Sequence, residues 1–228
     1  MSFRVQNRAT RIVAGVFGAV AALAGLEHGL GEILQGPGRP GSLVFASWSG
    51  VPLFKVLGGE PALSILPDLV ASGVVTVALS LLLLAWTTVA RRRVGLGTAL
   101  ICIPLLACGG GFGPPLLGLL VAIVAGRSAA PLAWWRGKAP VALRRLLAGG
   151  WPAILACGVA AWFALMPGLM LLDAVAGVPG LASAVPGVTL AAFCGLGLSA
   201  VSGCARDASS QGRSRFPRGR TRSRRPGQ

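Results

Sequence analysis

The sequence predicts an all-α fold, a polytopic integral membrane bundle of about six helical segments. Of its 228 residues, 54% are hydrophobic and only 12% are charged, whereas soluble domains carry about 25% charged residues. Long stretches contain no charged side chain at all, and the 21 lysines and arginines are concentrated in a few places. This composition excludes an ordinary soluble enzyme, and its apolar content excludes a wholly disordered basic protein.

Four uncharged stretches are long enough to cross a membrane, since a transmembrane helix needs about 20 mostly apolar residues. They are 69–90, 94–126, 146–172 and 174–205. A shorter apolar stretch, 12–26, precedes the first acidic residues. We expect a single transmembrane domain over 1–205. Its predicted segments are 11–34, 65–90, 94–109, 114–126, 150–172 and 181–204.

The stretch 94–126 is too long for one ordinary span, and we divide it at residues 109–115. These residues are rich in glycine and proline, which end helices or begin new ones. The two arms reach only about 20–24 Å at 1.5 Å per residue. The hairpin therefore either crosses the membrane fully or is re-entrant, and in both cases the chain returns to the side it came from.

The basic residues orient this bundle. With the hairpin, both termini share one side with 19 of the 21 lysines and arginines, and only Arg39 and Lys55 lie on the other. Without the hairpin the division is 6 against 15. Cytoplasmic segments carry the excess of basic residues, so we expect both termini in the cytoplasm, at a bacterial-type cell membrane.

The first segment also fits a cleaved signal peptide. Basic residues precede an apolar stretch that ends in Ala22-Leu23-Ala24, a small-residue pattern typical of cleavage sites. The helical pattern nevertheless continues to Leu34, which favours a retained span.

A stripe of small residues runs along this first segment at spacings of three and four, which places them on one helix face. Small residues let helices approach closely in lipid, so we expect the stripe to pack against another helix. A composition rich in glycine and alanine can also produce such a stripe by chance. The residues are Gly15, Gly18, Ala22, Gly25 and Gly29.

Glu27, His28 and Glu32 are the cluster of titratable residues that falls within a predicted span. Ionisable residues in membrane segments are costly and often mark ion or proton paths. A histidine beside carboxylates can relay protons or hold a divalent cation. The alternative is a polar helix end close to water, with a glutamate paired to Arg39 or Lys55.

Asp68 is a fourth candidate for an ion, proton or ligand site, because it starts the second segment on the same outer side. A carboxylate in the first turn of a helix also complements the helix dipole. Capping is therefore the simpler expectation for this residue.

The sequence predicts no catalytic residue, no cofactor and no metal site. A single histidine cannot supply a multi-histidine metal centre. Ser199 and Ser202 suggest a serine nucleophile, but they would lie at the opposite membrane face from His28. The glycine-rich turn lacks the Lys-Ser/Thr of a phosphate loop. We expect the five cysteines to be buried small hydrophobes.

The extramembrane parts have distinct compositions. The outer loop 35–64 is too apolar to float in water, so we expect an interfacial helix or a lid over the bundle. The inner loop 127–149 should hold a short surface helix with Pro140 near its first turn. Residues 206–228 should form a disordered, arginine-rich cytoplasmic tail that contacts anionic lipid rather than nucleic acid.

These features predict a small multi-pass integral membrane protein that is not an enzyme and acts as an accessory, scaffold or sensor unit. Its expected partners are anionic lipid headgroups at the inner face and a membrane protein. The alternative is a small transporter or channel with a titratable site at the outer end of the first segment. Nothing in the sequence specifies the oligomeric state.

Overall fold

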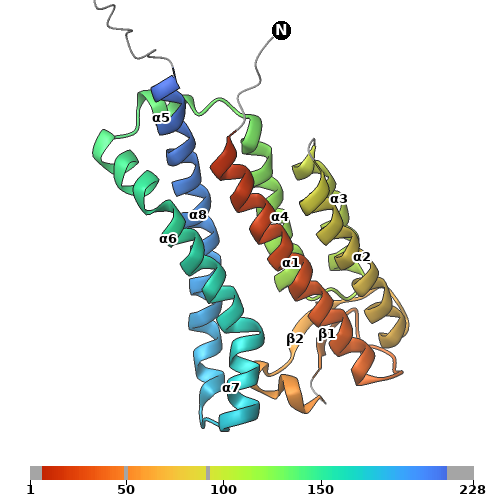
Figure 1. The fold of residues 1–228 in the computed structure, drawn as a ribbon. Coiled ribbons are helices and arrows are strands. Elements are labelled where there is room, and N and C mark those ends of the chain that lie inside the picture. The colour runs from red at the N-terminus through yellow and green to blue at the C-terminus, as the bar shows by residue number, and fades with distance from the viewer. Residues whose placement is uncertain (1–6, 49–50, 91–92, 215–228) are drawn as a thin grey trace, which may run out of the picture.

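The computed structural model describes residues 7–48, 51–90 and 93–214, and most of them are helical. The all-α prediction is confirmed, and each predicted segment is represented by a helix (Figure 1). The α-helices are α1 (Arg8–Gln35), α2 (Leu69–Val89), α3 (Val94–Ala107), α4 (Gly113–Gly126), α5 (Ala133–Gly137), α6 (Val141–Phe163), α7 (Leu169–Ala176) and α8 (Val185–Ser214). Shorter elements are β1 (Val44–Ser47), β2 (Glu60–Leu63), the 3₁₀ helices η1 (Pro52–Leu57), η2 (Arg127–Ala129) and η4 (Leu181–Ala184), and the π-type segment η3 (Ala164–Gly168).

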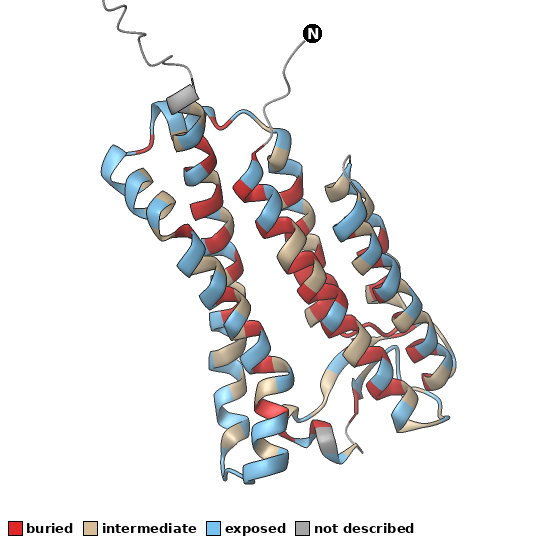
Figure 2. Cartoon of the chain, in the orientation of Figure 1, coloured by how far each residue is buried: buried red, intermediate tan, exposed pale blue. Residues whose placement is uncertain are grey.

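α1 lies at the centre of the bundle, with α2 and α4 on one side and the α6–α8 pair on the other (Figure 1). Its buried residues run along most of its length (Figure 2). α6 and α8 cross closely at Gly158 and Gly195, where a Cβ on Gly195 would lie 2.6 Å from the Cα of Gly158. Glycine at both positions therefore permits this crossing.

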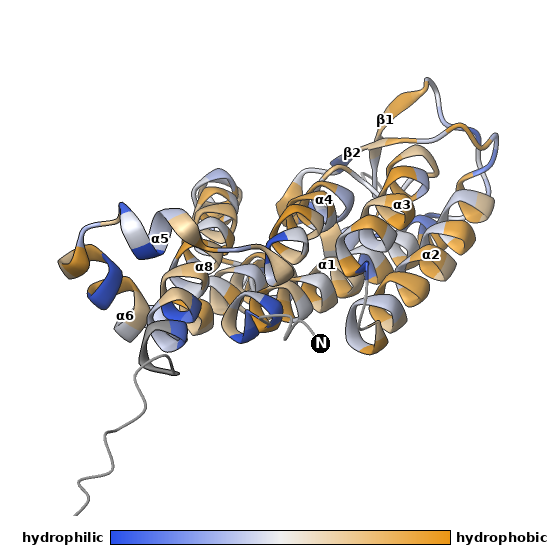
Figure 3. Cartoon of the chain, turned by 90° about the horizontal axis from the view of Figure 1, so that it is seen from above, coloured by the Kyte–Doolittle hydropathy of each residue, from blue (hydrophilic) through white to orange (hydrophobic). Residues whose placement is uncertain are grey.

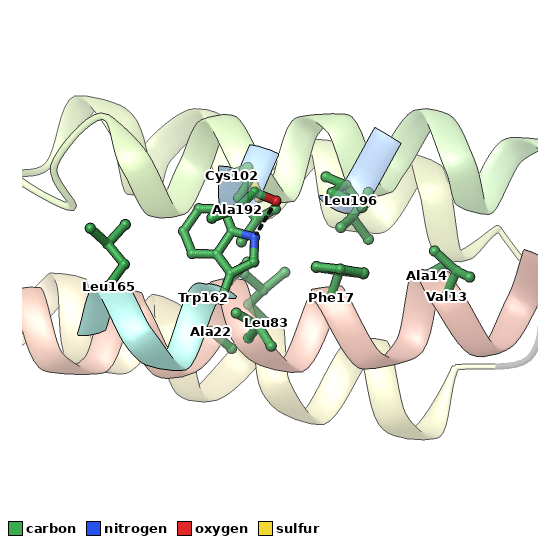
Figure 4. Close-up of a cluster of buried hydrophobic side chains, with 14 of the residues drawn as sticks. Val13, Ala14, Phe17, Ala22, Leu83, Cys102, Trp162, Leu165, Ala192 and Leu196 are labelled. Atoms are coloured by element: carbon green, nitrogen blue, oxygen red, sulfur yellow. Dashed lines mark hydrogen bonds between the residues drawn. The ribbon is translucent and has the colours of Figure 1, made fainter. Parts of the chain in front are cut away.

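Apolar side chains from both halves of the bundle fill the core (Figure 4). Phe17 of α1 is fully buried, and a Cβ on Gly158 would lie 3.1 Å from its ring. Trp162 of α6 donates a hydrogen bond from its indole nitrogen to the carbonyl of Ala192 on α8, at 3.1 Å. This bond satisfies the polar atom of a ring that is otherwise packed among hydrocarbon.

Within the described residues, four helices are long and apolar enough to cross a membrane, namely Arg8–Gln35, Leu69–Val89, Val141–Ala176 and Leu181–Gln211. α3 and α4 are shorter apolar helices. Many large apolar side chains on the helices are exposed, and hydrophobic residues predominate along most of the helices (Figure 3). Such a surface would cause aggregation in water and suits a lipid environment.

The α3–α4 hairpin runs alongside α1 for much of its length. At one end, Gly111 in its turn lies against His28. At the other, the side chain of Asn7 donates hydrogen bonds to the carbonyls of Arg127 and Ala130, just after α4. The short arms therefore extend from the level of His28 to the first residues of α1.

The small-residue stripe of α1 meets α2 over much of its length. A Cβ on Gly18 would lie 2.7 Å from Thr87, and one on Gly29 would lie 2.8 Å from the carbonyl oxygen of Gly73. Gly25 faces Ser80 in the same way, and Ala22 is fully buried. Gly15 differs, because within the described ranges a Cβ there would meet nothing within 4 Å.

Two details of the later helices differ from expectation. The predicted segment 150–172 is interrupted by η3, where Met166 has an extended conformation and Pro167 removes a backbone donor. The surface helix expected to start near Pro140 is instead the beginning of α6, for which Pro140 is the N-cap residue.

The prediction that a disordered tail begins at residue 206 is wrong, because α8 continues through residues 206–214. Asp207 is 4% exposed and accepts hydrogen bonds from the backbone nitrogens of Ala9 and Thr10, at 2.9 and 2.8 Å. The carboxylate thereby satisfies free donors at the N-terminus of α1 and holds the end of α8 against it. Residues 215–228 lie outside the described residues.

The outer loop folds back on the bundle as a β-hairpin instead of the expected interfacial helix. β1 and β2 pair antiparallel, with Val44 opposite Leu63 and Ser47 opposite Glu60. The loop also contains η1, which contributes the buried Phe54. The hairpin and η1 together cover one end of the bundle, which is the arrangement expected in the alternative prediction of a lid.

Candidate functional site

A buried cluster of titratable side chains lies at the end of α1 that the β-hairpin covers. His28 and Glu32 are one helical turn apart on α1, and both side chains are 0% exposed. The Nε2 atom of His28 lies 3.6 Å from the Oε1 atom of Glu32. The residues expected at a water-accessible helix end are therefore enclosed by protein.

The β-hairpin supplies a second carboxylate and a hydroxyl to this cluster. Glu60 of β2 places its Oε2 atom 3.3 Å from the Nδ1 atom of His28. Ser47 of β1, the cross-strand neighbour of Glu60, donates a hydrogen bond to Glu32 at 3.0 Å. Because the two residues are paired across the hairpin, its register brings Glu60 to His28 and Ser47 to Glu32.

Trp48 closes the cluster from the hairpin side. Its ring centroid lies 4.3 Å from that of His28, and its indole nitrogen donates a hydrogen bond to the His28 carbonyl at 3.2 Å. The indole is fully buried and also contacts the ring of Phe54, with the centroids 4.6 Å apart. Movement of the hairpin would therefore change the surroundings of His28 directly.

The turn between α3 and α4 covers the cluster from a third direction. Gly109 and Gly111 have φ values of +97° and +67°, a region that side chains disfavour. A Cβ on Gly109 would overlap Ser72 and lie 2.8 Å from Glu32. The backbone nitrogen of Gly113 donates a hydrogen bond to Glu60 at 2.8 Å. Glycine thus lets the turn approach both carboxylates closely.

The cluster contains polar atoms without a hydrogen-bond partner. Among the described residues, the Nε2 atom of His28 and the Oε2 atom of Glu32 are buried and form no hydrogen bond, although Nε2 lies within ion-pair distance of Glu32 Oε1. A buried polar atom left without a partner costs about 1–3 kcal/mol. Such atoms have an unused capacity to bind a proton or a small polar species.

A line of hydroxyl groups on α2 begins beside this cluster. Ser72 and Thr76 both donate to the carbonyl of Cys108, at 2.7 and 3.2 Å. The Ser80 hydroxyl is buried and has no hydrogen-bond partner in the described part of the chain. Thr87 lies further along the same helix. We call Ser72, Thr76, Ser80 and Thr87 the hydroxyl stripe.

Of the other two candidate residues, Glu27 lies next to His28 in the sequence and Asp68 lies outside the cluster. Glu27 is half-buried, and its charge interacts with those of His28 and Glu60. Asp68 does not join the cluster, because it is the N-cap residue of α2 and accepts a hydrogen bond from the Ala71 nitrogen at 2.9 Å. Within the described part of the chain, neither Arg39 nor Lys55 forms an ion pair with the glutamates.

Sequence reasoning missed Glu60, Ser47 and Trp48. Glu60 belongs to the outer loop, and nothing in its flanking sequence indicates a strand. The strand Glu60–Leu63 has four residues and includes Pro61, which is depleted in strands. A short two-stranded hairpin that depends on tertiary packing leaves little local signal.

The chemistry available at the cluster is proton uptake and release by an imidazole between two carboxylates. In the part of the chain that the structure describes, no three His, Cys, Asp or Glu residues are arranged to hold a metal ion. Of the cysteines, only Cys102 is buried as expected, and Cys157 and Cys194 are exposed on the outer faces of α6 and α8.

The comparisons with known proteins found no matching family model, no matching curated protein and no matching solved structure.

Proposed function

We propose that this chain is a multi-pass membrane protein, without enzymatic activity, that senses protons through the His28 cluster. The observation that carries the proposal is the complete burial of His28 between Glu32 and Glu60, under a hairpin formed by the outer loop. A sensor needs a titratable group and a movable element that responds to its charge. The His28 imidazole and the β1–β2 hairpin supply this pair.

Proton binding and hairpin position are linked through the cost of burying charge. Glu27 and Glu32 from α1 and Glu60 from β2 are the titratable groups that act on His28. Trp48, directly after β1, packs on the His28 ring, and Ser47 of β1 donates to Glu32. The α3–α4 turn faces His28 with glycine backbone. Unbalanced charge in such a site costs several kcal/mol. A change in protonation therefore shifts the equilibrium between the closed hairpin and a hydrated one.

The orientation in the membrane is part of the same proposal. The first residues of α1 and the last residues of α8 lie at one end of the bundle, and the His28 cluster lies towards the other (Figure 1). The excess of arginine and lysine at the first end supports its placement in the cytoplasm. The six segments would then expose the hairpin on the outer side of a cell membrane.

Trp48 provides a direct test. An imidazolium ion in contact with an indole quenches its fluorescence, so emission from Trp48 should follow the charge of His28. Histidine ordinarily changes charge between about pH 5 and 8. In proteoliposomes, the emission of Trp48 is the difference in fluorescence between the parent protein and Trp48→Phe. This emission should follow a titration curve when the outer pH is changed. The His28→Gln substitution should abolish the pH dependence.

Two further variants sharpen the result. Glu60→Gln should displace the titration midpoint, because it removes one carboxylate from His28. Asp68→Asn removes an outer carboxylate outside the cluster and should leave the curve unchanged. A titration that persists in His28→Gln would refute the proposal.

A second candidate function is proton or cation transport, favoured by the hydroxyl stripe of α2. The stripe begins next to Glu32 and continues towards the opposite end of the bundle, facing the small residues of α1. The unpaired Ser80 hydroxyl lies between the two ends of the stripe. Transport predicts a proton flux into liposomes that Ser80→Ala reduces, whereas a pure sensor shows no flux in either protein.

A further inference from the structure

A large cavity lies at the end of the bundle opposite the His28 cluster. It has a volume of about 1490 Å³ and is lined by the start of α1, the end of α2, the start of α3 and the end of α4. Small-molecule pockets typically measure about 300–1,000 Å³. The cavity is therefore large enough for part of a lipid molecule.

Three arginines give the cavity a positive charge. Arg8 and Arg11 come from α1, and Arg93 precedes α3. In the described ranges, no carboxylate forms an ion pair with any of the three. A cavity lined by three uncompensated guanidinium groups attracts an anion, and arginine binds phosphate oxygens through paired N–H groups.

The N-terminus of α3 adds donors at the same place. The cavity is lined by the first turn of this helix, whose N-terminus receives no side-chain cap from the residues that the structure describes. Its first N–H groups therefore lack intrahelical acceptors and are free to donate to an anion. This contribution is independent of the arginine charges.

The rest of the wall is apolar, which identifies the kind of anion. Ile12, Val16 and Leu96 line the cavity together with the backbone face of Gly15. Gly15 leaves the space open, because a Cβ there would meet no described atom within 4 Å. A small hydrated anion would not use these walls, whereas the acyl chains of a phospholipid would cover them.

We infer that this cavity is a binding site for one anionic phospholipid, with its phosphate on Arg8, Arg11 and Arg93 and its acyl chains beside Gly15. Basic pockets between helices on the cytoplasmic side bind lipid headgroups in this way. The inference rests on the proposed membrane location, and it is independent of proton binding at His28. A lipid bound in this cavity would contact the start of α1, the ends of α2 and α4 and the start of α3 at the same time.

The test measures phosphatidylglycerol and phosphatidylcholine bound to the full-length protein by native mass spectrometry. The parent should retain phosphatidylglycerol preferentially. Arg11→Gln and Arg93→Gln should each weaken the tightest-bound lipid about fivefold, which corresponds to about 1 kcal/mol per basic residue. Arg145→Gln is the matched control, because Arg145 is exposed at the start of α6, outside the cavity.

A second pair of variants tests the cavity itself without changing charge. Gly15→Leu should fill the space and reduce lipid binding, while the fold is retained because a Cβ there would meet no atom of the described residues within 4 Å. Gly197→Leu, on the exposed face of α8 with nothing within 4 Å, is its control and should have no effect.

Three outcomes would overturn the inference. These are equal lipid affinity in the parent and the arginine variants, an equal effect of Arg145→Gln, and undiminished binding in Gly15→Leu. If excess inorganic phosphate displaces the lipid and binds Gly15→Leu equally well, the cavity holds a free anion. Failure here leaves the Trp48 titration unaffected, so the two proposals are separable.

Discussion

Gly111 lies against the imidazole ring of His28, so closely that a Cβ at position 111 would come within 2.6 Å of the Nδ1 and Cε1 atoms. The same glycine has a φ of +67°. Both the space and the backbone conformation therefore require glycine. The turn that connects α3 to α4 is thus also one wall of the titratable cluster.

Gly111→Ala should destabilise the protein and disturb the cluster. A side chain in the left-handed region costs about 1–2 kcal/mol, and overpacking adds about 1–3 kcal/mol. We expect a loss of about 3 kcal/mol in the free energy of unfolding, measured by denaturation in mixed micelles.

Gly58→Ala separates the two contributions. Gly58 has a similar φ of +69°, but a Cβ there would meet nothing within 4 Å. Only the backbone cost of about 1–2 kcal/mol applies. Equal losses in the two variants would contradict the close packing of Gly111 on His28.

The small residues of α1 should tolerate substitution very differently. Gly29→Ala would place its Cβ 2.8 Å from the carbonyl oxygen of Gly73 and should cost about 1–3 kcal/mol. Gly15→Ala meets open space and gains helix propensity, so it should be neutral or stabilising by up to about 1 kcal/mol. Thermal unfolding of the two purified variants measures the difference, and a cost at Gly15 would contradict the open cavity.

Much of the fold was predictable because membrane helices leave strong local signals. The positions of α2, α3 and α4 follow from runs without charge and from the helix-breaking residues between them. The extension of α8 past residue 205 was not predictable from composition, because it depends on Asp207 meeting α1. That contact joins residues almost 200 positions apart in the chain.

The candidate site was predictable only in part. His28 and Glu32 are four residues apart on one helix, and this spacing alone places them together. Glu60 reaches His28 through a hairpin register that no local pattern specifies. The glycines of the α3–α4 turn indicated a helix break, but their role as a wall of the cluster depends on tertiary packing.

Asp207→Asn should weaken the attachment of α8 to α1. The carboxylate accepts hydrogen bonds from the Ala9 and Thr10 nitrogens and from the Thr10 hydroxyl, all at 2.8–2.9 Å. An asparagine keeps one acceptor and loses the charge, so the expected loss is about 1–2 kcal/mol. Hydrogen exchange at the first turn of α1 should rise.

Asp173→Asn is the matched control for this prediction. Asp173 belongs to α7, and neither of its carboxylate oxygens forms a hydrogen bond or ion pair with the described residues. Its replacement should change the free energy of unfolding by less than about 0.5 kcal/mol. A similar loss in both variants would show that the effect of Asp207 is one of overall charge.

The coupling between His28 and Glu32 can be measured by a double-mutant cycle. Removing one partner of a buried pair leaves the other uncompensated and typically costs about 3–5 kcal/mol. His28→Gln and Glu32→Gln should each be costly, and the double variant should cost at least about 1 kcal/mol less than their sum. A cycle between His28 and Asp68, which caps α2 outside the cluster, should be additive within about 0.5 kcal/mol. If both cycles were additive, His28 and Glu32 would be buried side by side without interacting, and the cluster would have no means of transmitting a protonation change.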